Sequence, residues 1–232
     1  LHDYVREDLK KPYRALMPFV QITILEAGGT ILSTFDETLR EYTSRLFRRE
    51  HIEIQENSPV VSVDEQNVRL KNGTDIPYGL LVWSTGIGPT PLVLSLPFPK
   101  SKTNRVVTDE QFRVKGQVDI FALGDCAAFA AHELPATSQV AQQEGRYLAR
   151  LLTREREGRE TPPFRYRHFG MLAYVGGNRA LADLSVFKGR GLTTWVFWRS
   201  AYLTKLVSVK NKILVLFDWT KTIIFGRDIS RF

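Results

Sequence analysis

Residues 118–127 read VDIFALGDCA, an apolar run that stops at a glycine followed by an acid. The run predicts a β-strand, and Gly124 after it lets the backbone turn and approach a ligand closely. Asp125 then places a short carboxylate at the carboxyl end of that strand, where open α/β sheets bind ligands and where a carboxylate accepts hydrogen bonds from hydroxyl groups. Taken alone, the stretch fits better an ordinary strand followed by an Asp-capped turn.

Two earlier apolar runs end in the same way. QITILEAGG, residues 21–29, predicts a buried strand that ends at Glu26 and two glycines, and the apolar run 79–83 ends near Thr85 and Gly86. A carboxylate at the position of Glu26 hydrogen-bonds the ribose hydroxyls of a dinucleotide and repels a ribose phosphate, so it favours NADH over NADPH. Because the sequence lacks the glycine fingerprint expected about 20 residues before such an acid, an ordinary strand-end acid is at least as good an interpretation. Three such strand ends in succession are more informative than any one of them.

The rest of the sequence predicts an α/β protein. A helix follows Phe35, a strand includes residues 51–54, and an antiparallel meander spans 60–71 with an Asn72-Gly73 turn. A capped helix begins near Thr137 and Ser138, within LPATSQVAQQEGRYLARLL, and paired strands follow in 171–184. The prolines of 88–100 and the charged run 154–163 predict domain boundaries.

Charge and cysteine content narrow the function classes. The net charge of the 232 residues is +7, and residues 187–232, here called the basic tail, hold nine basic and two acidic residues, so the tail carries the whole excess. Such a tail suggests that the binding partner is an anionic membrane surface or nucleic acid. Nucleic acid is disfavoured because no recognised binding fold accompanies the charge.

Cys126 is the only cysteine, which excludes an internal disulfide and a multi-cysteine metal site. No metal site is predicted.

The basic tail contains two amphipathic aromatic stretches. The first places Trp195, Trp198, Tyr202 and Leu206 on one helical face, and the second does the same with Ile213, Leu216, Phe217 and Ile224. Basic residues interrupt both stretches, which predicts helices that lie in a membrane interface rather than cross the bilayer. The alternative is that these side chains form a core or a homodimer interface.

Six sequence blocks together carry a family resemblance. They are TILEAGG, LLVWSTG, DIFALGD, LPATSQVAQQEGRYLA, FGMLAYVGGNRAL and FDWTKTIIFGRD. From end to end the chain resembles the carboxyl-terminal half of a type II NADH:quinone oxidoreductase, the single-subunit flavoprotein also called alternative NADH dehydrogenase. The resemblance implies a two-dinucleotide-binding-domain flavoprotein, Rossmann-like and incomplete here. It implies a partial NADH-binding domain at 1–90, the end of the FAD-binding domain at 91–162, and a region for membrane docking and the quinone site at 163–232.

The resemblance also implies site residues. Gly124 and Asp125 would hold FAD, and Glu26, Thr85 and Gly86 would line the cofactor sites. The unpaired N–H groups of Gln139 and Val140, at the start of the helix, would stabilise negative charge on the reduced flavin. Gln139 and Gln142, three apart on one face, would reach the flavin edge and the quinone headgroup. Some relatives have histidine in place of Gln142, so no titrating group is assumed at this position. For Gln142, a role as an ordinary exposed helix residue is nearly as good an interpretation as a role in the quinone site. Cys126 is interpreted as a packing residue.

The function that follows is electron transfer from NADH through FAD to a membrane quinone, without proton pumping. The expected location is peripheral, on the mitochondrial inner membrane or a bacterial cytoplasmic membrane, with no targeting segment readable. Leu1 is not an initiator methionine, so the sequence is interpreted as a fragment or a processed product. Two alternatives remain open: a soluble flavin-dependent NAD(P)H reductase of another acceptor, and a non-catalytic fragment that lacks the glycine-rich fingerprints.

Overall fold

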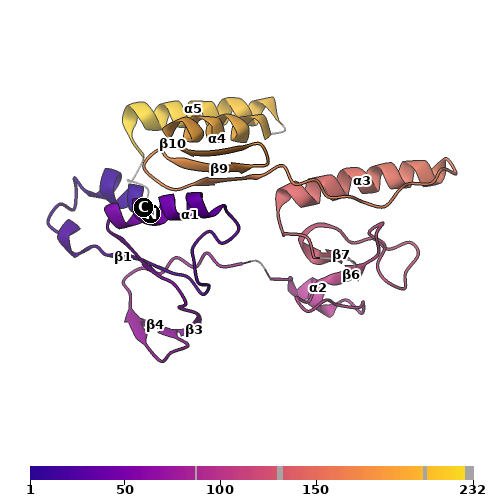
Figure 1. Ribbon diagram of the computed structural model, residues 1–232, viewed down its shortest axis with the longest axis horizontal. Coiled ribbons are helices and arrows are strands. Elements are labelled where there is room, and N and C mark those ends of the chain that lie inside the picture. The colour runs from indigo at the N-terminus through magenta and orange to yellow at the C-terminus, as the bar shows by residue number, and fades with distance from the viewer. Residues whose placement is uncertain (87, 130–132, 206–207, 228–232) are drawn as a thin grey trace. The chain divides into compact units, whose positions relative to one another are not determined.

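A computed structural model describes residues 1–86, 88–129, 133–205 and 208–227 (Figure 1). The chain divides into two compact units. Unit 1 combines Leu1–Leu81 with Phe169–Phe232, and unit 2 is Val82–His168. The regions predicted as 1–90 and 163–232 therefore meet in one unit, for the most part, because strands from the second pack on a helix from the first.

Unit 1 contains a βαβ motif, whose strand, helix and strand the sequence predicts as separate elements. Strand β1 (Ile22–Leu25) pairs in parallel with β2 (Ile52–Gln55), and α1 (Glu37–Arg49) connects them. The side chain of Asp36 caps α1 by accepting a hydrogen bond from the amide of Thr38 (3.0 Å). The three-stranded antiparallel meander follows, with its turn at Asn72 and Gly73 as expected. Its strands are β3 (Val60–Val63), β4 (Asn67–Leu70) and β5 (Asp75–Pro77), and the short helices η1 (Tyr4–Leu9) and η2 (Met17–Phe19) precede β1.

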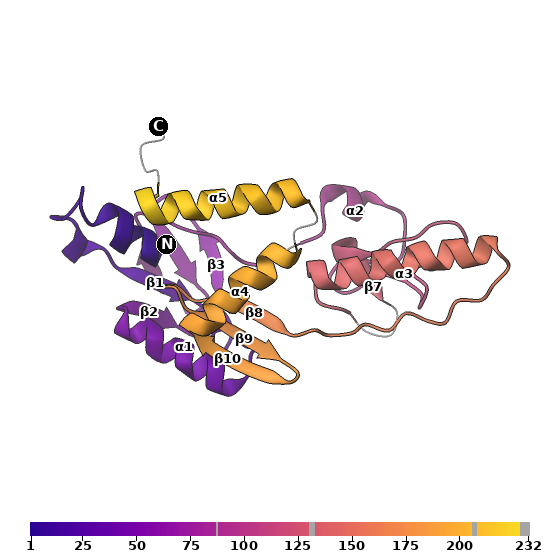
Figure 2. The same cartoon turned by 90° about the horizontal axis from the view of Figure 1, so that it is seen from above.

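The second part of unit 1 is an antiparallel sheet between helices. Its strands are β8 (Met171–Tyr174), β9 (Ala180–Leu184) and β10 (Phe187–Gly191), in the order β10-β9-β8. Leu39 and Leu46 of α1 form a core with Val175 and Leu181 on one side of this sheet. On the other side α4 (Leu192–Lys205) lies across the three strands, and α5 (Val209–Phe225) contacts α4 (Figure 2).

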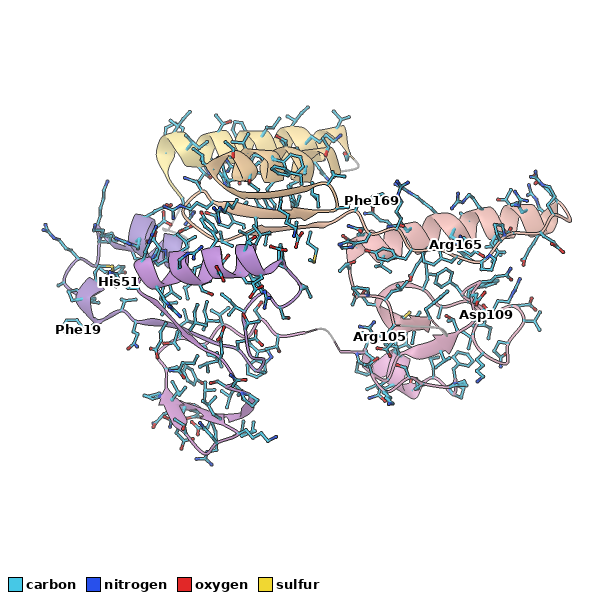
Figure 3. The ribbon with its side chains drawn as sticks, viewed as in Figure 1. Phe19, His51, Arg105, Asp109, Arg165 and Phe169 are labelled. Carbon is cyan, nitrogen blue, oxygen red and sulfur yellow. The ribbon has the colours of Figure 1, made fainter. Side chains whose placement is uncertain are left out.

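Unit 2 is smaller and has little regular sheet. Strand β6 (Val106–Thr108) pairs in parallel with β7 (Ala127–Phe129), and the turn η3 (Gly124–Cys126) comes directly before β7. The helices are α2 (Pro91–Ser95) and α3 (Ser138–Arg156). The aromatic rings of Phe112, Tyr147 and Phe164 pack edge to face on one another, and Leu151 joins them in the core that holds α3. After β6, Asp109, which Figure 3 labels, closes a turn by accepting from the amides of Gln111 (2.8 Å) and Arg113 (2.9 Å).

Two predicted strands are not strands in this structure. Residues 79–83 are irregular, and 118–123 take part only in an isolated bridge between Phe121 and Arg113. Segment 118–123 still forms a backbone hydrogen bond to the stretch around Phe112, because the amide of Ala122 donates to the carbonyl of Phe112 (3.0 Å). Phe112 has a φ of 65°, outside the β region, which interrupts a regular ladder. Apolar composition favours an extended backbone, but a strand also needs a regularly paired neighbour.

Candidate functional site

The turn after Leu123 is held by a carboxylate from α3. Gly124 has a φ of 71°, which favours glycine, and its amide donates to Oε2 of Glu144 (2.5 Å). Glu144 is only 4% exposed, and this burial raises the pKa of its carboxyl, with a further increase from the charge of Asp125. A Cβ added at Gly124 would stand 3.5 Å from Cβ of Ala141, so this turn and α3 lie in direct contact.

The next two residues of the turn face different surroundings. Asp125 is exposed, and among the described residues its carboxylate has no hydrogen-bond or ion-pair partner. Cys126 is half-buried and packs against the cluster of Val93, Val106 and Val114, while its thiol lies 3.2 Å from the carbonyl of Leu123. The interpretation of Cys126 as a packing residue is confirmed, and the carboxylate of Asp125 is available for a ligand.

Helix α3 begins where the sequence predicts, with a correction to one of its amides. Thr137 is the N-cap, and its hydroxyl accepts from the amide of Val140 (3.4 Å). The expectation that the Val140 amide is unpaired is therefore wrong, because the cap side chain already occupies it. The amino end of the helix dipole still lies next to the Gly124–Cys126 turn, since α3 and η3 pack together.

The two predicted glutamines differ in how they are held. Gln139 is half-buried, and its Oε1 accepts from the hydroxyl of Tyr166 (2.8 Å), which also lies 3.2 Å from Nδ1 of His168. Burial raises the pKa of Tyr166, so its hydroxyl stays protonated and able to donate. Gln142 is exposed, and no partner is found for it among the described residues. One glutamine is thus fixed in place, and the other is open to solvent.

Glu26 in unit 1 closes its own turn. Its Oε1 accepts from the amide of Gly28 (2.7 Å), while its backbone bonds to Gln55, the last residue of β2, and to Ser58 beyond that strand. Within the described part of the chain Oε2 has no partner, so one carboxylate oxygen is open to a hydroxyl group. Thr85 and Gly86 are exposed and irregular, and a Cβ at Gly86 would meet nothing within 4 Å. The structure therefore gives Glu26 a defined place but does not organise Thr85 and Gly86.

Three residues that sequence reasoning missed complete the arrangement in unit 2. They are Glu144, Tyr166 and Gln143, whose side-chain amide bonds to both the carbonyl and the amide of Arg167 (2.9 and 3.0 Å). The sequence could have indicated Glu144, because its spacing places it on the same helical face as the buried Val140, Tyr147 and Leu151. An acid on the apolar face of a helix indicates a specific partner. Nothing in the sequence near Tyr166 indicates its contact with Gln139.

The two tail helices bury different fractions of their apolar surface. In α4 Trp198 stacks on Tyr174 (5.7 Å between ring centroids) and on Tyr202, and Arg199 lies over Trp195 and over Trp219 of α5. The aromatic face of α4 is therefore partly packed within unit 1: Trp195 and Trp198 are half-buried, while Tyr202 is still 49% exposed. Leu206, predicted on that face, lies outside the described residues.

Helix α5 exposes its apolar face. Ile213, Phe217 and Ile224 are 61%, 69% and 65% exposed. Lys210 and Lys221 are exposed beside them, with no ion pair found among the described residues. Other basic residues of the tail are engaged: Lys188 pairs with Asp36, and Arg227 pairs with Asp8 (2.8 Å). In the described residues, no helix combines the length and the apolar content that a membrane span requires.

Comparisons with known proteins agree with the predicted resemblance. The family described as pyridine nucleotide-disulphide oxidoreductase matches residues 11–145, and the NDH2 C-terminal domain matches 168–228. A "Probable NADH dehydrogenase" of Dictyostelium discoideum is 43% identical over all of this chain and 52% of its own length. The "Internal alternative NAD(P)H-ubiquinone oxidoreductase A1, mitochondrial" of Solanum tuberosum is 40% identical over all of this chain and 50% of its own.

A solved structure extends the agreement to the fold. NDH2 from Plasmodium falciparum, in complex with NADH, aligns over 99% of this chain and 63% of its own with a TM-score of 0.90 and 21% identity. The chain spans about half the length of the curated relatives that it matches. The predicted α/β flavoprotein fold and the predicted resemblance are thereby confirmed. The chain belongs to the pyridine nucleotide-disulphide oxidoreductase family, and its residues 168–228 match the NDH2 C-terminal domain.

Proposed function

We propose that the protein that contains this chain transfers electrons from NADH through FAD to a membrane quinone without pumping protons. The observation that carries the proposal is the joined turn and helix of unit 2, in which buried Glu144 holds the amide of Gly124 and leaves the carboxylate of Asp125 exposed beside the start of α3. Relatives named NADH dehydrogenase and NAD(P)H-ubiquinone oxidoreductase support it.

The residues of this turn suit FAD. The glycine conformation brings backbone close to a ligand, and the free carboxylate of Asp125 accepts hydrogen bonds from ribityl hydroxyls, which are donors. The amino end of α3 stabilises negative charge on a ligand close to it, and Gln139, fixed by Tyr166, presents an amide of defined orientation. FAD, when bound, supplies the hydride and electron chemistry.

The other predicted site residues have supporting roles in this proposal. Gln142 is exposed on α3 and can donate to or accept from a quinone carbonyl. The open Oε2 of Glu26 accepts from a ribose hydroxyl of NADH, and its charge disfavours a ribose phosphate. Thr85 and Gly86 are proposed to approach a cofactor through an exposed hydroxyl and an open backbone, and the Val140 amide contributes only through the helix dipole.

The test uses the full-length protein and a matched pair of variants. In Asp125→Ala the flavin absorbance per purified protein is expected to fall roughly tenfold, because charge-assisted hydrogen bonds to the cofactor are lost. Asp119→Ala removes an exposed acid from the same stretch of sequence and should retain flavin and NADH:quinone activity. Wild-type protein that purifies without flavin, or equal flavin content in both variants, would contradict the proposal.

Membrane docking through α5 belongs to the same proposal. Its exposed Ile213, Phe217 and Ile224 form an apolar face, and Lys210 and Lys221 on the same side suit an anionic lipid surface. The relatives named mitochondrial support a peripheral place on the mitochondrial inner membrane. A soluble reductase whose exposed α5 face forms a homodimer is the alternative.

Flotation with anionic vesicles separates these two alternatives. The variant Phe217→Ser/Ile224→Ser should remain in the unbound fraction, while Val61→Ser, which removes an exposed apolar side chain from β3, should float like the wild type. If the wild type does not float and the double variant converts a dimer to a monomer, α5 is a homodimer interface instead. In that outcome the redox proposal is unaffected.

A further inference from the structure

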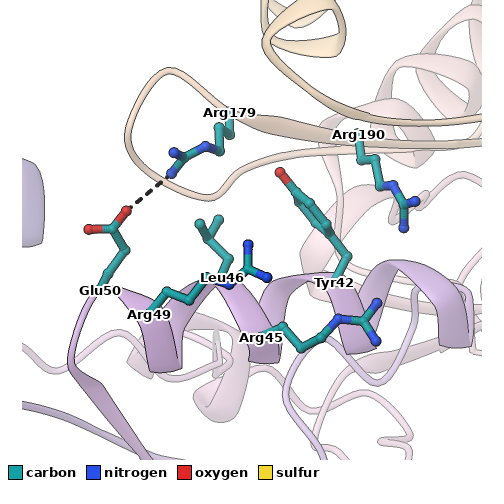
Figure 4. A pocket seen from close by; sticks show the side chains of 7 residues that line it. All are labelled: Tyr42, Arg45, Leu46, Arg49, Glu50, Arg179 and Arg190. Atoms are coloured by element: carbon teal, nitrogen blue, oxygen red, sulfur yellow. Dashed lines mark hydrogen bonds and ion pairs between the residues drawn. The ribbon is translucent and has the colours of Figure 1, made fainter.

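A cavity of about 270 Å³ lies within unit 1, between α1 and the β8-β9-β10 sheet (Figure 4). Arg45 and Arg49 reach it from α1, while Arg179 and Arg190 reach it from the sheet side. The apolar side chain of Leu46 and the ring of Tyr42 complete the lining, and Glu50 supplies the only carboxylate. None of these residues has a role in the proposed redox function.

The lining of the cavity carries more positive than negative charge. Glu50 is already shared, because its Oε2 accepts from Arg6 (2.9 Å) and its Oε1 accepts from Arg179 (3.2 Å). These contacts satisfy the carboxylate, so it does not offset the remaining guanidinium groups. Three arginines therefore face the cavity without a strong internal counterion.

The contacts of those three arginines are weak or apolar. Arg45 lies 3.5 Å from Glu41, an exposed pair of the kind that contributes little. Arg190 covers the ring of Tyr42 at 5.2 Å, a cation–π contact that leaves its N–H donors open. Arg49 has no ion-pair partner among the described residues, nor does the hydroxyl of Tyr42 have a hydrogen-bond partner there.

Guanidinium groups suit a phosphate, whose oxygens accept paired N–H bonds, and several of them line this one cavity. The cavity volume lies below the range typical of drug-sized ligands, which fits a small anion rather than a dinucleotide. We propose that this cavity binds a phosphate group of a small anion, carried either by a soluble phosphate or diphosphate ester or by a phospholipid headgroup.

Isothermal titration calorimetry of the full-length protein with inorganic pyrophosphate tests the site. The wild type should bind saturably at one site per chain. Arg45→Gln/Arg49→Gln should weaken binding at least roughly tenfold, since two charged donors are lost, whereas Arg48→Gln, at an exposed position of α1 outside the cavity, should stay within about twofold.

Three results would overturn the proposal: no saturable binding, equal weakening in Arg48→Gln, or wild-type affinity in the double variant. Glutamine is a good helix former and both positions are exposed, so the fold should persist. If the double variant is unfolded by circular dichroism, Arg49→Gln alone takes its place with about threefold weaker binding expected, and unchanged affinity overturns the proposal.

Vesicle flotation then separates the two sources of phosphate. Phosphatidic acid vesicles are compared with phosphatidylcholine vesicles, using the double variant and Arg48→Gln, which share an intact α5. If only the double variant loses flotation with phosphatidic acid, the phosphate is a lipid headgroup. If the two variants float alike while pyrophosphate binding differs, the ligand is soluble.

Discussion

Two turns with a carboxylate at the end of an apolar run are held in opposite ways. In unit 1 Glu26 bonds to the amide of Gly28, two residues further on, and so closes its own turn (2.7 Å). In unit 2 Asp125 bonds to nothing among the described residues, and the turn is held by Glu144, twenty residues beyond Gly124. The first turn is a local structure, whereas the second depends on the packing of α3.

How each turn is held determines how its carboxylate can be used. Glu26 uses one oxygen for its own loop and offers the other, so its position tolerates changes elsewhere in the chain. Asp125 offers its whole carboxylate because a different acid, buried on another element, performs the structural task. A change in α3 should therefore disturb the second turn but not the first. Four predictions test this contrast, in decreasing order of expected size.

Glu144→Ala should lower the free energy of unfolding of unit 2 by about 1–3 kcal/mol, because it leaves the half-buried amide of Gly124 without its acceptor. Urea unfolding of the full-length protein measures the effect, and flavin content should fall with it. Arg146→Ala, an exposed change on the same helix, should leave both unchanged. Equal stability of Glu144→Ala and the wild type would show that the turn is local after all.

The second prediction compares the two glycines. Gly124→Ala forces a side chain into a φ of 71° and should cost about 1 kcal/mol in urea unfolding. Gly28 has no such φ, and its added Cβ would meet only the flexible carboxylate of Glu26 at 3.2 Å. Gly28→Ala should therefore change stability by less than roughly 0.5 kcal/mol. If Gly28→Ala proves the more damaging, the contrast between the turns fails.

The third prediction concerns the open oxygen of Glu26 and depends on the proposed function. Glu26→Gln keeps the hydrogen bond from Gly28 but loses charge, so the KM for NADH should rise roughly threefold while kcat stays the same. Glu65→Gln, at an exposed acid in the same unit, is the control. A fall in kcat at constant KM would assign Glu26 a different role.

The smallest effect is a pH dependence. Burial raises the pKa of Glu144 above its usual 4.5, so between 4.5 and the raised pKa the folded protein binds more protons than the unfolded chain. Its contribution is therefore complete below pH 4.5 and is lost as pH rises through the folded pKa. Glu144→Gln lacks this loss and should gain stability relative to the wild type across that window. Parallel pH curves in urea unfolding would contradict the prediction.

The elements that depend on residue types at fixed spacings could be predicted from the sequence. They are the separate strand, helix and strand that form β1, α1 and β2, the meander with its Asn72-Gly73 turn, and the Thr137 cap. The strands expected at 79–83 and 118–123 did not follow, because apolar composition does not supply a paired neighbour. The sequence predicted a membrane-facing aromatic face on α4, and only the structure shows that Trp198 stacks on Tyr174 and that Arg199 lies over Trp219, which leaves this face partly packed.

The stretch VDIFALGDCA predicted a turn at Gly124 followed by the carboxylate of Asp125, but by itself it favoured an ordinary Asp-capped turn over a ligand site. The sequence also specified where α3 begins and that the tail carries the excess charge. Three-dimensional packing was needed to establish that buried Glu144 holds the turn, that Tyr166 orients Gln139, and that Trp198 of α4 stacks on Tyr174 while Phe217 and Ile224 of α5 stay exposed. These features join residues far apart in the chain, and their energy comes from burial and partners that local sequence does not specify.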